Sequence, residues 1–254
     1  MQASSMTLKY RITFLGVVLG TSFLSAQKRI DHQGLYWFRY YNQLTLNQHW
    51  VFHNELDDRR FFKFNRQQHL IMHSRIHYKI SKTMELAFGF TYSLQGPQDP
   101  ETGTGLMIPE KRIVQQIDMS TPLNSRFSLV HRLRIDDRFI RKNNGQILLP
   151  GDDFNFRFRY RLMINYFLSP KLATHPAILK LSNETMINAG KHILYNTFDQ
   201  NRLAFSMEYQ FSPFVSAELG YMHWYQQRSS GYQFYSRDIL RFTFYHRISF
   251  NKSI

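Results

Sequence analysis

Strand-length stretches in which aromatic or aliphatic residues alternate with polar, mostly cationic ones constrain the fold of this chain more than any other feature. The clearest stretch covers residues 154–168, with the sequence FNFRFRYRLMINYFL. Successive side chains of a β-strand point to opposite faces, so one face carries eight aromatic or aliphatic residues and the other carries Arg157, Arg159 and Arg161. At about 3.3 Å per residue the stretch is roughly 50 Å long, enough for a tilted strand to cross a bilayer. The pattern predicts a transmembrane β-barrel.

The chain begins with the pattern of a secretory signal peptide. Lys9 and Arg11 precede an apolar stretch at residues 12–24, and Ala26 is the small residue that signal peptidase requires. The apolar stretch is too short for a transmembrane helix. The sequence contains no cysteine, which excludes a lipoprotein anchor, a disulfide framework and a thiolate metal site. We predict cleavage before Gln27, with residues 1–26 as signal peptide and residues 27–254 as one outer-membrane β-barrel domain.

The charge of the chain limits its partners. Formal net charge is +14, and removal of Lys9 and Arg11 with the signal peptide would leave +12. The remaining basic residues are spread over alternating positions, and no nucleic-acid-binding motif is present, so we expect no nucleic acid partner. Outer-membrane lipid and a small anionic solute are the partners that such a charge favours.

Strand-like stretches recur along the chain, and short connections tend to alternate with long ones. Tight periplasmic turns opposite longer external loops are typical of outer-membrane barrels. We count about eleven stretches, at residues 35–46, 50–59, 67–80, 84–94, 112–120, 126–138, 154–168, 178–188, 201–211, 215–226 and 239–250. Bacterial single-chain barrels favour even numbers with both termini in the periplasm. We therefore predict an all-β, up-and-down antiparallel barrel of about 12 strands, with 10 as the alternative, and look for the missing strand at residues 27–34.

Alternation alone does not say which face points outward, because a soluble barrel would place Phe in its core and Arg in water. Strand length and the pattern of connections favour the membrane. The last strand adds a third argument, since its apolar face ends at the aromatic Phe250 and resembles the C-terminal recognition signal of outer-membrane barrels. We expect the rings to face lipid and the guanidinium groups to face the lumen.

Several segments resemble a known bacterial family. They are Phe198-Asp199-Gln200-Asn201-Arg202-Leu203, Tyr209-Gln210-Phe211-Ser212, Glu218-Leu219-Gly220-Tyr221-Met222, Trp37, the turn at residues 47–50, and the Arg-rich strands around Arg132-Leu133-Arg134 and residues 157–161. Together they are similar to the outer-membrane proteins of domain of unknown function 2490, common in Bacteroidota. The resemblance covers most of the mature chain and implies an outer-membrane β-barrel. It supplies no established activity or catalytic residue.

Assigning the polar phase to the lumen gives a set of lumen-lining candidates. They are Arg132, Arg134, Arg157, Arg159, Arg161, Glu184, Arg202, Glu208, Glu218 and Arg241. Isolated charges are costly in an enclosed lumen, so we expect many of them to form Arg–carboxylate pairs. Because Arg outnumbers carboxylate in this set, a second interpretation is a basic lumen that binds or passes a small anion. The function that we predict is therefore a structural, porin-like protein or a narrow anion-preferring pore in a Gram-negative outer membrane, monomeric, with a charged and largely occluded lumen.

Three histidines on one predicted strand invite a metal interpretation. His69, His73 and His77 share a face, but residues four apart on a strand lie about 13 Å apart. One zinc ion needs its nitrogen ligands at about 2.0–2.1 Å, so these three cannot share an ion without partners from neighbouring strands. We expect lumen polar residues here, and we predict neither a metal site nor a cofactor.

A lipid-modifying hydrolase of the phospholipase or lipid A deacylase type is the alternative function. His131, His223 and His246 interrupt the lipid-facing phase and are the candidate bases. Such an enzyme needs a serine within hydrogen-bond reach of the histidine, and no G-x-S-x-G motif is present. The sequence favours a protein without enzymatic activity. Residues 95–109 and 139–151 are the longest predicted loops, and neither contains a ligand motif.

Overall fold

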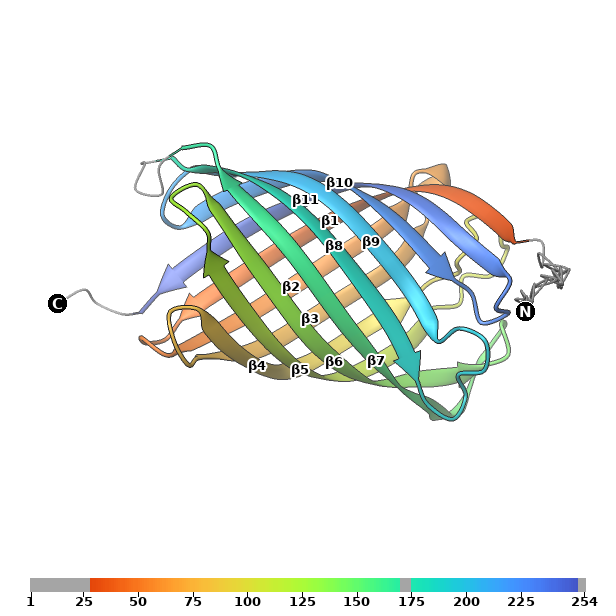
Figure 1. Ribbon diagram of the computed structural model, residues 1–254. Coiled ribbons are helices and arrows are strands. Elements are labelled where there is room, and N and C mark those ends of the chain that lie inside the picture. The colour runs from red at the N-terminus through yellow and green to blue at the C-terminus, as the bar shows by residue number, and fades with distance from the viewer. Residues whose placement is uncertain (1–27, 170–174, 251–254) are drawn as a thin grey trace, which may run out of the picture.

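The alternating stretches form the strands of a closed barrel (Figure 1). A computed structural model of the protein describes residues 28–169 and 175–250. The predicted signal peptide lies outside these residues. Within them, no helix has the length and apolar content needed to cross a lipid bilayer.

Eleven strands are present in the described residues, and they contain 12 to 20 residues each. Their bounds are β1 (Arg29–Thr45), β2 (Trp50–Phe61), β3 (Gln67–Lys79), β4 (Met84–Gln95), β5 (Ile108–Pro122), β6 (Phe127–Asn143), β7 (Leu148–Phe167), β8 (Ala177–Ala189), β9 (Phe198–Gln210), β10 (Val215–Gln227) and β11 (Gln233–Ser249). A single turn of 3-10 helix, η1 (Lys63–Asn65), lies between β2 and β3. The all-β barrel that the alternation predicts is confirmed.

Five of the connections are four-residue turns with a common chemistry. In each, an Asn or Ser side-chain oxygen accepts hydrogen bonds from the backbone N–H groups two and three residues later, which closes the turn locally. These side chains belong to Asn47, Ser81, Asn124, Asn144 and Ser212. Four of these turns lie at one end of the barrel, together with the end of β11; we call it the short-turn end. The opposite end, where β1 begins, is the loop end (Figure 1).

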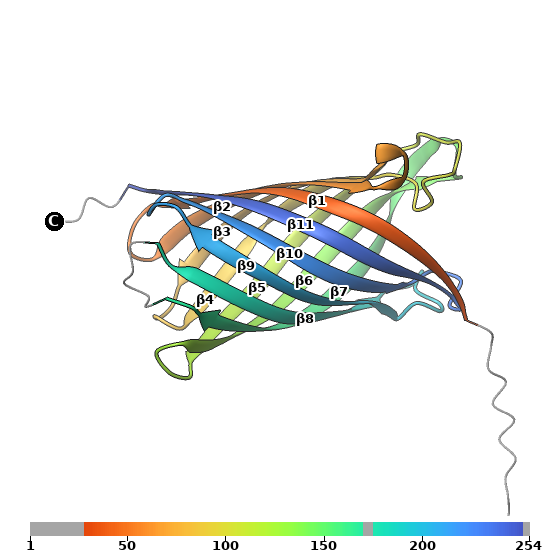
Figure 2. The ribbon, with the colours of Figure 1, turned by 90° about the horizontal axis from the view of Figure 1, so that it is seen from above.

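The barrel closes between β1 and β11, and this pair is parallel. The register runs from Arg29 opposite Gln233 to Thr45 opposite Ser249, and every other neighbouring pair is antiparallel. Figure 2 shows β1 and β11 side by side along the barrel. An odd number of up-and-down strands leaves the first and last pointing the same way, so they can only pair in parallel. The prediction of about 12 strands, with 10 as the alternative, is wrong: most of the expected extra strand, from Arg29 onward, is the first part of β1.

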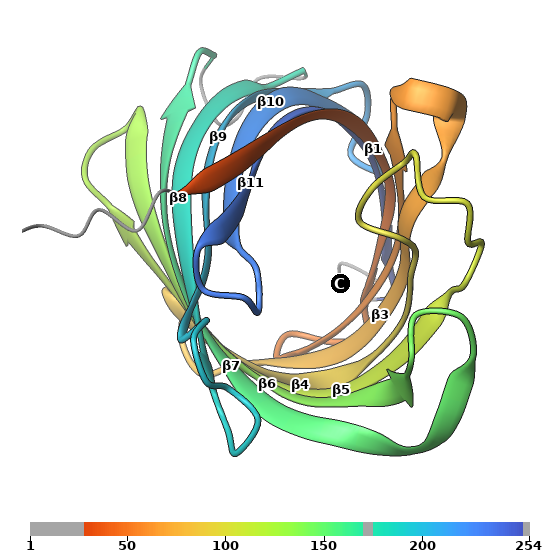
Figure 3. The same ribbon diagram turned by 90° about the vertical axis from the view of Figure 1, so that its right-hand side faces the viewer.

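The inside and the outside of the barrel differ in the way the alternation predicts. Viewed along its axis, the strands form a ring around a lumen (Figure 3). In β7, Phe156 and Phe158 point outward and are 38% and 39% exposed, whereas Arg157 between them is 8% exposed and points inward. The alternative arrangement, with Phe in the core of the barrel and Arg on its outer face, is therefore not the one that the structure shows.

The two predicted long loops differ in the structure. Residues 139–151 are not a loop: β6 and β7 continue through most of them and meet in a four-residue turn. The other loop, residues 96–107, is held by Arg66, whose guanidinium donates to the backbone carbonyls of Pro100, Thr102 and Thr104. This loop sends Gln98 to the lumen, where its side-chain oxygen accepts from Arg237 at 3.0 Å.

Candidate functional site: the arginine-lined lumen

The lumen contains a cavity of about 730 Å³ with residues of all eleven strands on its wall. Fourteen arginine and lysine side chains line it against six carboxylates. Four more carboxylates are buried in the wall beside it, and each pairs with an arginine or lysine; they are Asp57, Glu110, Asp136 and Glu208. A surplus of positive charge remains even when these are included.

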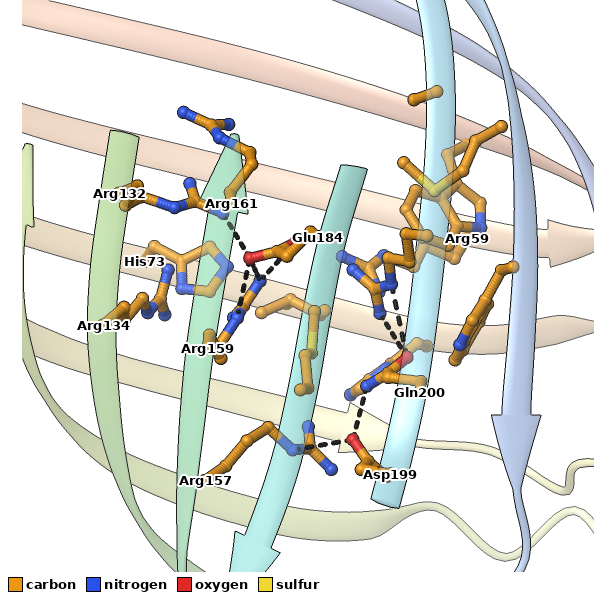
Figure 4. Close-up of a pocket in the computed structure, with 18 of the residues that line it drawn as sticks. Arg59, His73, Arg132, Arg134, Arg157, Arg159, Arg161, Glu184, Asp199 and Gln200 are labelled. Atoms are coloured by element: carbon orange, nitrogen blue, oxygen red, sulfur yellow. Dashed lines mark hydrogen bonds and ion pairs between the residues drawn. The ribbon is translucent and has the colours of Figure 1, made fainter. Parts of the chain in front are cut away.

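Glu184 and Asp136 are the centre of an arginine network on β6, β7 and β8. Figure 4 shows Glu184 with Arg132 and Arg159. Glu184 accepts from Arg132 at 2.6 Å and, through both oxygens, from Arg159 at 3.0 and 3.1 Å. Asp136 accepts from Arg134 at 2.6 Å and from Arg159 at 3.3 Å. The cross-strand register places Arg132 opposite Arg161 and Arg134 opposite Arg159, so like charges face each other and the two carboxylates hold them together.

Arg161 is the member of this group without a partner. It lies in register with Glu184 on β8, yet among the described residues it forms no hydrogen bond and no ion pair, and its buried Nε has no acceptor. Buried nitrogens of Arg132, Arg134 and Arg75 also lack acceptors. Four guanidinium groups around the same part of the lumen therefore keep unsatisfied donors.

Toward the loop end, two tryptophans support a second group of arginines. Trp37 and Trp224 pack edge to face with ring centroids 5.7 Å apart. Arg59 lies 3.9 Å over Trp37, Arg202 lies 4.7 Å from Trp224, and Arg237 lies 4.5 Å from Trp224. Cation–π contacts of this kind stabilise a guanidinium without removing its charge.

The guanidinium groups of Arg202 and Arg237 also donate hydrogen bonds to side-chain amide oxygens. Gln200 accepts from Arg202 at 3.0 and 3.2 Å, and Gln33 and Gln226 each accept from Arg237 at 2.7 Å. An amide oxygen satisfies the donor but leaves the positive charge in place. Neither arginine forms an ion pair with a carboxylate in the described part of the chain.

Most of the remaining charged residues of the lumen are paired. Near the loop end, Arg157 binds Asp199 at 2.9 Å. Toward the short-turn end, Glu218 binds Lys180 at 2.7 Å and Arg241 at 2.5 Å. There, Glu208 also accepts from Lys180, at 2.5 Å, and from Arg247, at 2.7 Å.

The structure places all ten lumen-lining candidates on the inner face. Nine of them line the cavity, and Glu208 lies in the wall beside it. The sequence interpretation missed Arg59, Glu110 and Arg237, which lie at or beyond the edges of the predicted strands. Each is in phase with the inward-facing residues of its own strand, so following the alternation to both ends of every strand would have found them.

The three histidines of β3 all face the lumen and do not share one site. His73 is hydrogen-bonded to the hydroxyl of Thr91 at 2.6 Å. His77 instead meets carboxylates of neighbouring strands, since one ligand atom each from His77, Glu85 and Asp118 lies within 4.8 Å of the other two. A metal site on this strand would need ligands from neighbouring strands, and at His77 the carboxylates of Glu85 and Asp118 are such candidate ligands.

The candidate bases of the hydrolase alternative lie on the outer surface. His131 is hydrogen-bonded to the hydroxyl of Tyr160 and His246 to that of Tyr40, each at 2.9 Å. His223 lies 3.3 Å from Asp238. In residues 28–169 and 175–250, no serine hydroxyl is hydrogen-bonded to any of the three, so the nucleophile–base pair of a serine hydrolase is not assembled there.

Most of the chain matches the profile of a protein family. The profile of a family described as "Protein of unknown function (DUF2490)" matches residues 34–235, which include nearly the whole barrel. No curated protein matches the sequence.

Proposed function

This chain belongs to the DUF2490 family of unknown function, and we propose that it is a monomeric outer-membrane barrel whose narrow lumen admits small anions in preference to cations. The proposal has two parts, a location in lipid and a cationic path through the barrel. Each is supported by a different face of the same strands.

The outer face supports the location. Every strand exposes at least one large apolar side chain on this face. One from each strand in order is Phe38, Leu56, Met72, Phe88, Ile113, Leu133, Phe158, Leu181, Leu203, Leu219 and Leu240. A continuous apolar surface around a molecule is costly in water and stable in hydrocarbon. Strands of at least 12 residues exceed the roughly 9–11 that a tilted membrane strand needs.

The inner face supports anion preference, and the observation that carries it is the set of arginines without carboxylate partners. Arg161, Arg202 and Arg237 keep their charge, and the cavity wall as a whole carries fourteen cationic groups against six carboxylates. Clefts lined by one sign of charge concentrate counter-ions of the other sign. A small anion entering this lumen is attracted, and a cation is repelled.

The lumen is also narrow. Gln98 of the 96–107 loop bonds to Gln68 on β3 and to Arg237 on β11, so it projects into the lumen near the loop end. Ion pairs such as Arg159–Glu184 also lie inside the lumen. We therefore expect a low conductance and passage of small solutes only.

Planar-bilayer recording of the purified, refolded protein tests the proposal. Under a salt gradient, the sign of the reversal potential should show that Cl⁻ passes in preference to K⁺. Arg161→Gln removes a charge about 4–8 Å from a passing anion, which in a water-like dielectric weakens the attraction by about 0.5–1 kcal/mol, or about two- to sixfold in anion occupancy. Arg126→Gln, at an exposed position in the turn between β5 and β6, is the matched control and should leave selectivity unchanged.

Two results contradict the proposal: conductance no greater than that of protein-free lipid, or a preference for K⁺. Turnover of phospholipid or lipid A by the same preparation would support the hydrolase alternative instead. The geometry does not favour that alternative, because the three surface histidines bind tyrosine hydroxyls and a carboxylate.

A further inference from the structure

Two carboxylates on the cavity wall are exceptions to the pairing of charges in the lumen. Glu85 on β4 and Asp118 on β5 have no ion pair with any arginine or lysine of the described residues, although cationic groups dominate the wall around them. The other four cavity carboxylates each have at least one such pair; they are Glu55, Glu184, Asp199 and Glu218. The exception needs its own explanation.

Glu85 and Asp118 also lie directly opposite each other. They are register partners on neighbouring antiparallel strands, an arrangement in which like charges repel. Lys79, the register partner of Glu85 on β3, forms no ion pair with it. Among the described residues, Asp118 accepts one side-chain hydrogen bond, from the amide of Gln116 at 2.5 Å. Two adjacent carboxylates therefore lie on the cavity wall without a direct ion pair to an arginine or lysine of the described residues.

His77 adds a nitrogen ligand to this pair. Its imidazole is 3% exposed, its Nδ1 contacts the Glu85 carboxylate, and its buried Nε2 has no hydrogen-bond partner. The ring of His53 lies next to it, with centroids 3.8 Å apart, and the Nδ1 of His53 is hydrogen-bonded to the hydroxyl of Tyr41 at 2.5 Å. The imidazole of His53, which is oriented by Tyr41, therefore lies next to His77 and its two carboxylate neighbours.

We propose that His77, Glu85 and Asp118 bind one divalent transition-metal ion of the Zn²⁺ type. One nitrogen and two carboxylate ligands suit zinc better than calcium or magnesium, which prefer oxygen ligands alone. Ligand atoms around a tetrahedral zinc at about 2.0–2.1 Å lie about 3.4 Å from one another. The three candidate atoms already lie within 4.8 Å, so side-chain rotation is enough to bring them together.

The position in the barrel gives an ion a way in. Glu85 and Asp118 line both the lumen cavity and a second cavity of about 720 Å³ at the short-turn end. The second cavity is bordered by residues of the short turns, including His49 and Ser81. An ion in the second cavity therefore meets two of the three ligands, Glu85 and Asp118, at the short-turn end of the barrel. The site does not depend on anion passage, so either proposal can fail without the other.

The test uses Zn²⁺ alone, titrated into chelator-treated, detergent-refolded full-length protein and followed by calorimetry and by metal analysis after dialysis. The wild type should bind one Zn²⁺ per chain. Glu85→Gln with Asp118→Asn should raise the Kd at least about 100-fold, because two of three ligands lose their charge. Asp152→Asn with Asp153→Asn removes the same charge from the exposed start of β7 and should bind as the wild type does.

A second variant keeps the test decisive if the double substitution prevents folding. His77→Asn retains the carboxylates and should raise the Kd at least about tenfold, whereas His131→Asn on the outer surface should not. Absence of stoichiometric Zn²⁺ binding by the folded wild type overturns the proposal. Wild-type affinity in a folded Glu85/Asp118 or His77 variant overturns it as well, since the ion would then bind elsewhere.

Discussion

Substitution of Glu184 by Gln should destabilise the barrel, because Glu184 holds two arginines of the lumen. Glu184 is 6% exposed and, among the described residues, is the only carboxylate bound to Arg132, while it shares Arg159 with Asp136. Gln keeps the size of the side chain and one acceptor but removes the charge. The guanidinium groups of Arg132, Arg159 and the neighbouring Arg161 then have one carboxylate fewer among them.

The expected cost follows from these contacts. Removing one partner of a buried ion pair costs about 3–5 kcal/mol, because the other charge stays buried without compensation. Arg159 retains Asp136 at 3.3 Å, which places the estimate at the lower end, about 3 kcal/mol. Equilibrium unfolding in urea from lipid vesicles, followed by the fluorescence of the three tryptophans, measures the loss.

The matched control is Arg161→Gln, which changes the charge of the same cluster in the opposite direction. Arg161 has no ion pair, so its removal relieves repulsion and should leave stability unchanged or raise it by up to about 1 kcal/mol. A loss below about 1 kcal/mol for Glu184→Gln, or equal losses for both variants, would refute the argument that Glu184 holds the arginines together.

Two further substitutions test the outer face and the packing of the wall with the same unfolding assay. Phe158→Arg places a charge near the middle of the outer face and should lower the free energy of unfolding in lipid vesicles by about 2–4 kcal/mol. Its control is Phe64→Arg, in η1 at the loop end, which should lower it by less than about 1 kcal/mol. Equal effects of the two substitutions would argue against lipid around Phe158. Gly89→Ala should cost about 1–3 kcal/mol, because the new Cβ would lie 2.2 Å from the backbone oxygen of Ser74. Gly103→Ala meets nothing within 4 Å and should cost nothing, and an unaffected Gly89 variant would show that the strands can move apart.

Much of the fold follows from local information in the sequence. The period-two alternation determines the strand and places Arg157 and Phe158 on opposite faces, while strand length and the pattern of connections predict which of the two faces points outward. The turns were predictable for the same reason, since Asn47 or Ser81 closes its own turn. The family resemblance agreed with this and is confirmed by the match over residues 34–235.

The number of strands was not predictable, because closure depends on a contact between distant segments. Arg29 pairs with Gln233, more than 200 residues away, and no local pattern encodes a parallel pairing. The prediction used the preference for even strand numbers in bacterial barrels, while odd-numbered barrels also exist. Residues 29–34 continue β1 toward its N-terminal end and do not form a separate strand, which gives eleven strands.

The lumen was predictable as a set of residues but not as a set of partners. The polar phase identifies Arg161 and Glu184 equally well, yet only the register between β7 and β8 shows that they are opposite and remain unpaired. The group of His77, Glu85 and Asp118 was missed for this reason, since the search for metal ligands stayed within one strand. The sequence does carry one signal: His77 and Glu85 flank a tight turn in phase, which brings them together on one face.

The most direct measurement of the central claim compares two neighbouring positions on β8, Leu181 and Ser182. Leu181 points outward and is 46% exposed, whereas Ser182 lines the lumen cavity. The chain has no cysteine, so Leu181→Cys and Ser182→Cys each provide a unique site for a fluorescent label. In lipid vesicles, a lipid-soluble quencher should reach the label at position 181 and iodide should reach the label at position 182. Iodide quenching at 181 together with lipid quenching at 182, or equal quenching at both, would contradict an outer face in lipid around a hydrated, cationic lumen.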